Sequence, residues 1–157
     1  LKSTELSLHE IPHYINTTKF KYIELLKHYN FITTASVVFR KLDNFKIPHW
    51  FNKIPFGDLG LYKLVSKHTK IMCIDEVMSV YRLHENGIYT SLNKLQAMQN
   101  YLNFYKVIFT ALNPEEKQVV ISKKKEVIFK ISKLKFPRKP LVQKIYNKYL
   151  LLKNKNI

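Results

Sequence analysis

The chain has 157 residues, of which 27 are Lys or Arg and 11 are Asp or Glu, so its formal net charge is +16. A hydrophobic fraction of 46% is too high for an intrinsically disordered chain, and the length predicts one domain with a real core. Three glycines argue against a glycine-rich phosphate loop, and no apolar run approaches the ~18 residues that a membrane span needs. The single Cys73 excludes an internal disulfide and a cysteine-rich zinc site, which favours a reducing, cytoplasmic location. Because the chain opens at Leu1 in a polar stretch without targeting character, we expect it to be a piece of a longer product.

The first 90 residues alternate between helical and strand-like patterns. Helical spacing predicts a helix over 19–29, and β-branched and aromatic residues predict a buried strand over 31–39. An irregular, aromatic loop is expected over 41–57. We expect a second helix over 58–68, which begins with an acidic residue, and one or two strands over 71–83.

The pattern becomes purely helical after residue 90. Apolar residues step by three and four positions over 95–112, which predicts a long helix. A further helix is expected over 113–134, because Asn113 is suited to an N-cap, a Pro follows it, and Glu116 stands three residues after the cap. A shorter helix is expected over 141–152, so this part should form a bundle of two to three helices.

The positive charge is concentrated in the same helical part. Residues 1–90 carry 12 basic and 8 acidic side chains, whereas residues 91–157 carry 15 and 3. Lys supplies nearly all of the basic residues and lacks the planar fork of Arg, so the composition of this tail does not favour sequence-specific nucleic-acid binding. A solvated helix face is the simplest interpretation, an anionic membrane surface is the second and nucleic acid is the third. The basic residues that would contact an anionic partner are Lys123, Lys124, Lys125, Lys130, Lys133, Lys135, Arg138 and Lys139.

Three segments carry the residues suited to chemistry. The first spans 30–40 and ends in Arg, the second runs from Pro-His-Trp-Phe at 48–51 to Gly-Asp at 57–58, and the third reads Asp-Glu-Val-Met-Ser-Val-Tyr-Arg-Leu-His over 75–84. Their order and spacing resemble the C-terminal half of the catalytic domain of family 2 glycosyltransferases, the GT-A fold enzymes that build bacterial surface polysaccharides. The resemblance covers about residues 30–90. It implies a mixed, helix-rich α/β fold class, with a partial GT-A-like strand and helix unit in residues 1–90 and a basic helical extension in 91–157.

The resemblance also implies a reaction and a set of site residues. The reaction is transfer of a sugar from a nucleotide-sugar donor to an acceptor hydroxyl, with inversion, in cell-surface polysaccharide synthesis. Asp58 matches the catalytic base of the family, and Arg82 and His84 match a motif near the donor diphosphate, where His84 is also a candidate metal ligand. His49 and Trp50 are candidates for the acceptor side. The structural alternatives are a helix cap for Asp58, a surface ion pair for Arg82, a structural histidine for His84 and plain packing for Trp50.

Hydroxyl groups in the first segment allow two interpretations. Thr33, Thr34 and Ser36 could bind the sugar, but alternate strand residues near the core are the simpler interpretation. The remaining histidines have no metal-ligand spacing and are expected at the surface; they are His9, His13, His28 and His68.

The chain departs from the family pattern in several ways. Gly57 stands where an acidic residue often precedes the base, and Leu59 stands where an aromatic residue often follows it. No Asp-x-Asp motif occurs, so the divalent cation of the family, Mg²⁺ or Mn²⁺, is expected to bind the full-length enzyme through a motif that this chain lacks. We therefore expect a chain that carries the acceptor half of an active site, for a saccharide or lipid-linked acceptor, and that neither catalyses nor binds a sugar nucleotide by itself.

The alternative function is a non-enzymatic basic helical module that binds an anionic membrane surface or nucleic acid. The two functions are compatible, because a basic helical tail could hold a glycosyltransferase at the inner face of the cytoplasmic membrane. The expected location is accordingly cytoplasmic or peripheral at that membrane face.

Overall fold

The computed structural model describes residues 19–28, 31–40, 43, 45–66, 69–74, 76, 79, 91–137, 141, 144, 145, 147 and 148. Over these residues the protein is helix-rich, with four α-helices, short 3-10 helices and a two-stranded antiparallel sheet. The elements are β1 (Lys19–Phe20), α1 (Tyr22–His28), η1 (Thr34–Ser36), η2 (His49–Lys53), α2 (Gly57–Val65), β2 (Ile71–Met72), α3 (Lys94–Ile108), η3 (Phe109–Ala111) and α4 (Pro114–Lys135). Residues 141, 144, 145, 147 and 148 are also helical, within the range where a last helix is expected.

The helices α3 and α4 begin with the same local device. The Asn93 side chain accepts a hydrogen bond from the Gln96 amide at 2.9 Å, and the Gln96 side chain accepts one from the Asn93 amide at 3.0 Å. Asn113 and Glu116 form the equivalent reciprocal pair at the start of α4, at 2.9 Å in both directions. These bonds satisfy amide donors that a helix start leaves unpaired. The predicted start at Asn113 and the helix that follows it are confirmed.

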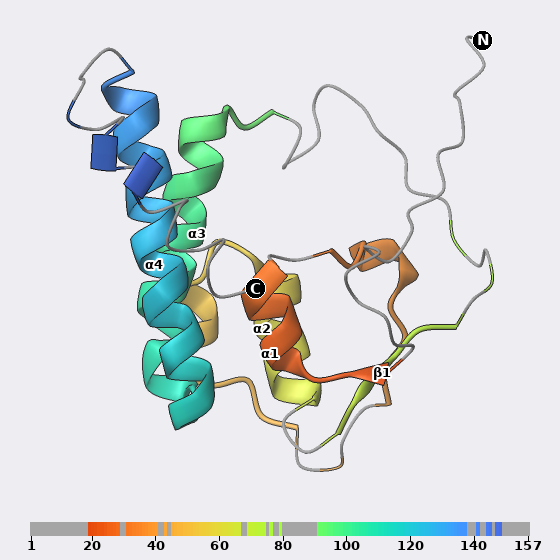
Figure 1. Cartoon of the computed structure of the whole chain (residues 1–157). Helices are drawn as coiled ribbons and strands as arrows, with labels where there is room; N and C mark the ends of the chain where they lie inside the picture. Colours follow the sequence, from red (N-terminus) through yellow and green to blue (C-terminus); the bar gives the residue numbers. More distant parts are fainter. Residues whose placement is uncertain are drawn as a thin grey trace, which may run out of the picture.

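The core lies where the four helices meet. Figure 1 shows α3 and α4 side by side, with α1 and α2 next to them, and α4 packs against both α3 and α1. The buried hydrophobic cluster contains Phe20, Tyr22, Leu25, Leu26, Leu59, Tyr62, Tyr101, Phe104, Tyr105, Ile108, Leu112, Val120 and Val127. The proposed division at residue 90 stays a prediction, and described residues on its two sides contribute to this one cluster.

The first predicted helix begins just after the first strand of the small sheet. The helix is confirmed but begins at Tyr22, because Lys19 and Phe20 are extended and pair with Met72 and Ile71 of β2. The strand predicted to begin at Ile71 is confirmed for its first two residues. Residues 75, 77, 78 and 80–83 of that prediction lie outside the described residues.

The buried strand predicted over 31–39 is wrong. The described residues 31–40 contain the 3-10 helix η1 and no strand. Val38 is 97% exposed and Phe39 is 43% exposed, so this stretch does not cross the core as a buried strand would. The Ser36 hydroxyl donates to the Thr33 carbonyl at 2.8 Å, and the Ser36 amide donates to the same oxygen at 3.0 Å. Local bonds of Ser and Thr compete with strand pairing, and β-branched residues favour a strand only where a partner surface exists.

Candidate functional site

Asp58 lies in the first turn of α2 but is not its N-cap. Phe56 occupies the cap position in an extended conformation and makes no side-chain cap bond. The Asp58 Oδ1 atom accepts a hydrogen bond from the Leu59 amide at 2.8 Å. This bond satisfies one of the free amide donors of the first helical turn, where the helix dipole also favours a negative charge. The N-cap alternative for Asp58 is therefore wrong: Asp58 lies two residues after the cap position, and its Oδ1 atom binds an amide of the first turn.

The second carboxylate oxygen meets a different part of the chain. The Thr34 hydroxyl donates to Asp58 Oδ2 at 3.2 Å, across 24 residues of sequence. Thr34 reaches this position because η1 turns the chain there, while the hydroxyls of Thr33 and Ser36 lie 3.2 Å apart and bond to each other. Thr34 is exposed and Asp58 is half-buried, so the pair lies at the surface. The structure therefore brings together the first two of the three segments that carry the resemblance.

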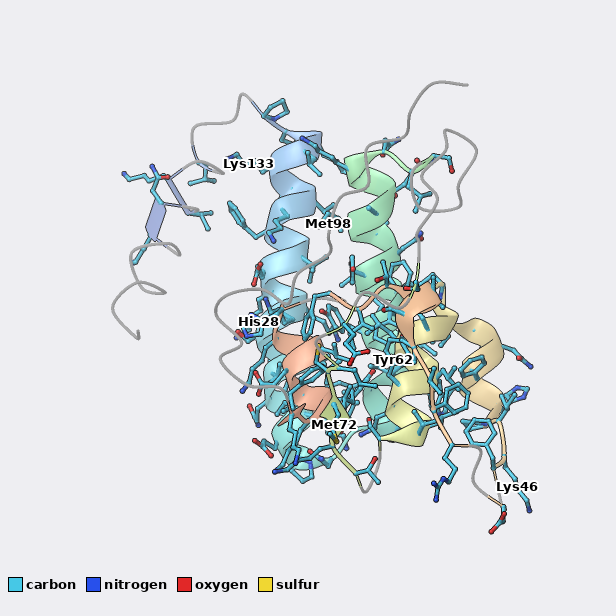
Figure 2. All side chains as sticks on the ribbon, turned by 90° about the vertical axis from the view of Figure 1, so that its right-hand side faces the viewer. His28, Lys46, Tyr62, Met72, Met98 and Lys133 are labelled. Carbon is cyan, nitrogen blue, oxygen red and sulfur yellow. The ribbon has the colours of Figure 1, made fainter. Side chains whose placement is uncertain are left out.

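A buried phenol lies on the inner side of this pair. Tyr62, which follows Asp58 by one helical turn, is 3% exposed and lies in the middle of the molecule in Figure 2. Its hydroxyl has no hydrogen-bond partner of acceptable geometry among the described residues. Burial raises the pKa of Tyr62 to about 12, the negative charge of Asp58 adds to the rise, and the Thr34 hydroxyl opposes it. Tyr62 is therefore a neutral phenol at physiological pH, close enough to Asp58 to respond to its charge.

Tyr22 on α1 is a second buried phenol of the same kind. It is 3% exposed, and its hydroxyl also lacks a partner within the described part of the chain. Burial raises the pKa of Tyr22 well above its ordinary 10.0, and the charges of Glu116 and Asp58 add to the rise. Both buried hydroxyls, which lack a partner among the described residues, are unusual, because an unsatisfied buried hydroxyl destabilises the fold.

A buried ion pair fixes the helix that carries Asp58. Lys63 on α2 donates to both carboxylate oxygens of Glu116 on α4, at 2.6 and 2.5 Å. Lys63 is 9% exposed and Glu116 is 5% exposed, and the Lys63 ammonium also lies 5.3 Å from the centre of the Tyr22 ring. Glu116 at the same time accepts the Asn113 amide, so one carboxylate caps α4 and binds α2. Sequence reasoning missed this pair, because 53 residues separate its members and no local pattern links them.

The two residues predicted for the acceptor side lie in η2, directly before α2. His49 is exposed, whereas Trp50 is partly buried and packs against the core cluster. The packing alternative for Trp50 is therefore realised, and an acceptor-binding role for His49 and Trp50 stays a prediction. His28, one of the histidines expected at the surface, is half-buried with its Nε2 3.8 Å from a Glu24 carboxylate oxygen.

Arg82 and His84 lie outside the described residues, as does most of the third segment. Their proposed contact with a donor diphosphate, and metal binding by His84, stay predictions. Within the described ranges, no group of three or more His, Cys, Asp or Glu side chains could hold a metal ion. The Mg²⁺ or Mn²⁺ ion that the resemblance implies is expected to bind through a motif that this chain lacks, and this stays a prediction.

A hollow of about 260 Å³ lies at the start of α1. It is lined by Lys19, Phe20, Lys21, Glu24 and Lys70, none of which is a predicted site residue.

Comparison of the chain with protein-family models, curated proteins and solved structures found no match. The candidate site therefore rests on the chain's own residues, with the Thr34 and Asp58 pair at its centre.

Proposed function

We propose that the chain forms the acceptor-side part of a glycosyltransferase in which Asp58 removes the proton from the acceptor hydroxyl. The observation that carries this proposal is the hydrogen bond from Thr34 to Asp58, because it joins two segments whose order resembles family 2 glycosyltransferases. Leu59 and Thr34 orient one carboxylate oxygen each. A held carboxylate that still reaches the surface is the group that general-base catalysis of this transfer needs.

The proposed reaction is one displacement at the anomeric carbon of a nucleotide sugar. The acceptor hydroxyl loses its proton to the Asp58 carboxylate while the acceptor oxygen forms a bond to the anomeric carbon. The bond from that carbon to the nucleoside diphosphate breaks, and the diphosphate leaves with the electron pair. Attack from the side opposite the leaving group inverts the configuration of the sugar carbon.

The other site residues keep the roles that the resemblance implies. Arg82 and His84 are proposed to bind the donor diphosphate, for which a guanidinium fork and an imidazole are suited. His49 and Trp50 are proposed to contact the saccharide or lipid-linked acceptor. Mg²⁺ or Mn²⁺ is proposed to bind the complete enzyme through residues outside this chain, and the product is proposed to be a cell-surface polysaccharide made at the cytoplasmic side of the membrane.

The Asp58→Asn substitution in the complete gene product tests the proposal. Asparagine keeps an oxygen that can accept the Leu59 amide, so α2 should remain folded while the basic group is lost. We expect kcat to fall about a hundredfold to ten-thousandfold, the usual contribution of a general base. Release of nucleoside diphosphate from nucleotide sugars, in the presence of Mg²⁺ and saccharide acceptors, measures the rate, and circular dichroism checks the fold.

Three further variants make this test specific. Asp43→Asn makes the same chemical change at an exposed turn residue and should retain wild-type turnover. Thr34→Val should lower kcat through loss of the bond to Asp58, and Thr34→Ser, which keeps the hydroxyl, should restore it. Near-wild-type turnover of Asp58→Asn, or equal losses in Asp58→Asn and Asp43→Asn, would refute the base assignment.

A further inference from the structure

The outward side of α4 carries exposed apolar side chains. Val120 and Val127 are fully buried, whereas the next residues along the chain, Ile121 and Ile128, are 37% and 49% exposed. Positions seven residues apart share one side of a helix, so the two isoleucines form a second apolar stripe that the core does not use. Phe136, directly after the helix, is also 49% exposed.

Exposed lysines lie on the same side of α4 as the two isoleucines, and exposed acidic residues do not. Lys125 lies four residues after Ile121 and three before Ile128, and Lys135 lies seven after Ile128, so all four side chains share one side of the helix. Lys125 and Lys135 are both exposed. The acids that could offset them are engaged elsewhere: Glu116 binds Lys63.

Glu126, the one acid of α4 beyond its first turn, is also buried and engaged. It binds Lys123 at 3.0 Å and Lys130 at 2.7 Å. The acidic residues of α4 therefore contribute no exposed carboxylate beyond Glu115 in its first turn. The stripe presents positive charge and apolar surface together.

The same combination continues beyond α4. Leu141 and Ile145 are helical, lie four residues apart and are 68% and 54% exposed. Lys144 and Lys148 are helical, exposed and also four residues apart. Residues at this spacing lie one above the other on a helix, so an apolar row runs beside a basic row.

We propose that the exposed stripe of α4, made of Ile121, Lys125, Ile128 and Lys135, binds the headgroup region of an anionic lipid bilayer, and that Leu141 and Ile145 add to this contact. Lysines are attracted to anionic headgroups, and isoleucine and leucine side chains leave water when they enter the acyl boundary. A nucleic acid would pair with the lysines but would leave the exposed apolar side chains in water. Among the described helices, none is long and apolar enough to cross a bilayer, so the proposed contact is with the membrane surface. This binding does not depend on the proposed glycosyl transfer.

Vesicle co-sedimentation of the full chain tests the proposal. We expect binding to vesicles of phosphatidylcholine that contain phosphatidylserine, weaker binding as salt rises, and no binding to phosphatidylcholine alone. Lys125→Gln combined with Lys135→Gln should weaken the partition constant about fivefold for each lysine, hence roughly 25-fold together. Ile121→Ser combined with Ile128→Ser should weaken it about tenfold, because the apolar contact is lost.

A matched control distinguishes binding through this surface from binding through net positive charge alone. Lys46 and Lys53 are exposed, and Figure 2 shows Lys46 at the opposite side of the molecule from Lys133 on α4. Lys46→Gln combined with Lys53→Gln removes two charges and should leave vesicle binding within about twofold of wild type. Equal weakening by both lysine pairs, equal binding to both kinds of vesicle, or binding to duplex DNA without binding to vesicles would overturn the proposal.

Discussion

Glu126 lies in the middle of α4 as a carboxylate held between two lysines. Burial alone would raise the pKa of Glu126, but hydrogen bonds from Lys130 and Lys123, together with their positive charges, outweigh burial and lower the pKa to about 2 from its ordinary 4.5. The bonds are 2.7 Å from Lys130 and 3.0 Å from Lys123. Because the ionised form is favoured in the folded state, this group links stability to pH on the acid side.

We expect Glu126→Gln to remove part of the acid sensitivity of the protein. Since the folded-state pKa lies below the unfolded value, the carboxylate stabilises the fold above pH 4.5, and that contribution is lost as the pH falls towards 2. The free energy of unfolding, measured by urea titration over this pH range, should fall more steeply for wild type than for Glu126→Gln. Glu115→Gln, an exposed acid of the same helix, should retain the wild-type slope. Parallel curves for wild type and Glu126→Gln would contradict the prediction.

At the level of elements, the contact between α2 and η2 positions the turn that carries Asp58. Gly60 is buried in α2, where an added Cβ would lie 2.2 Å from Ile54 Cδ1 and 3.1 Å from Cε2 of the Phe51 ring. The absence of a side chain at Gly60 therefore lets the end of η2 approach α2 closely. A glycine inside a helix costs about 1 kcal/mol relative to alanine, but an alanine at Gly60 would have to displace the Ile54 Cδ1 atom.

A double-mutant cycle tests that contact. Gly60→Ala should destabilise the protein by about 1 kcal/mol, because overpacking outweighs the gain in helix propensity. Ile54→Val removes the Cδ1 atom and should cost about 1 kcal/mol alone, but it should restore stability in the Gly60→Ala background. Chemical unfolding of the four proteins measures the coupling. Additive effects of the two substitutions would show that Gly60 has no such packing role.

At the level of the whole molecule, α4 connects the two halves of the chain. It packs against α3 and α1, its Glu116 binds Lys63 of α2, and its Val120 and Val127 belong to the same buried cluster as Leu25 of α1. Loss of either partner of this buried ion pair would leave a buried charge, at a cost of about 3–5 kcal/mol. The two halves should therefore unfold together.

Trp50 provides a direct measurement of this cooperativity. It is the only tryptophan, it lies in the first half of the chain and it packs against the core, whereas α3 and α4 of the second half dominate the far-ultraviolet circular dichroism. We expect tryptophan fluorescence and circular dichroism to report the same midpoint in urea. Lys63→Met should lower both midpoints together. A circular dichroism transition that persists after the fluorescence change would instead support an independently folded segment 91–157.

Prediction from sequence succeeds here where the deciding interactions are local. The helix starting after Asn113 is confirmed because its capping partners, Asn113 and Glu116, lie three residues apart. Prediction fails at 31–39, where β-branched residues indicate a strand but the bonds of Ser36 to Thr33 close a 3-10 turn instead. Strand formation needs a partner surface, and nothing within a short window of sequence specifies one.

The candidate site, too, can be predicted from the sequence only where local interactions decide it. The position of Asp58 in the first turn of a helix is evident from the residues around it, since a helix start favours an acidic side chain. Its contact with Thr34 and the bond from Lys63 to Glu116 are not evident, because each joins residues of different elements.

The sequence by itself determines the two long helices of the second half, the cap of α4 and the excess of lysine, because these follow from spacing and composition over a few turns. Only the tertiary structure decides which helix faces are buried, and hence that Ile121 and Ile128 remain exposed beside Lys125. It also decides that Thr34 reaches Asp58. The physical reason is that burial and long-range hydrogen bonds depend on which surfaces meet, and this is a property of the packed chain rather than of any one segment.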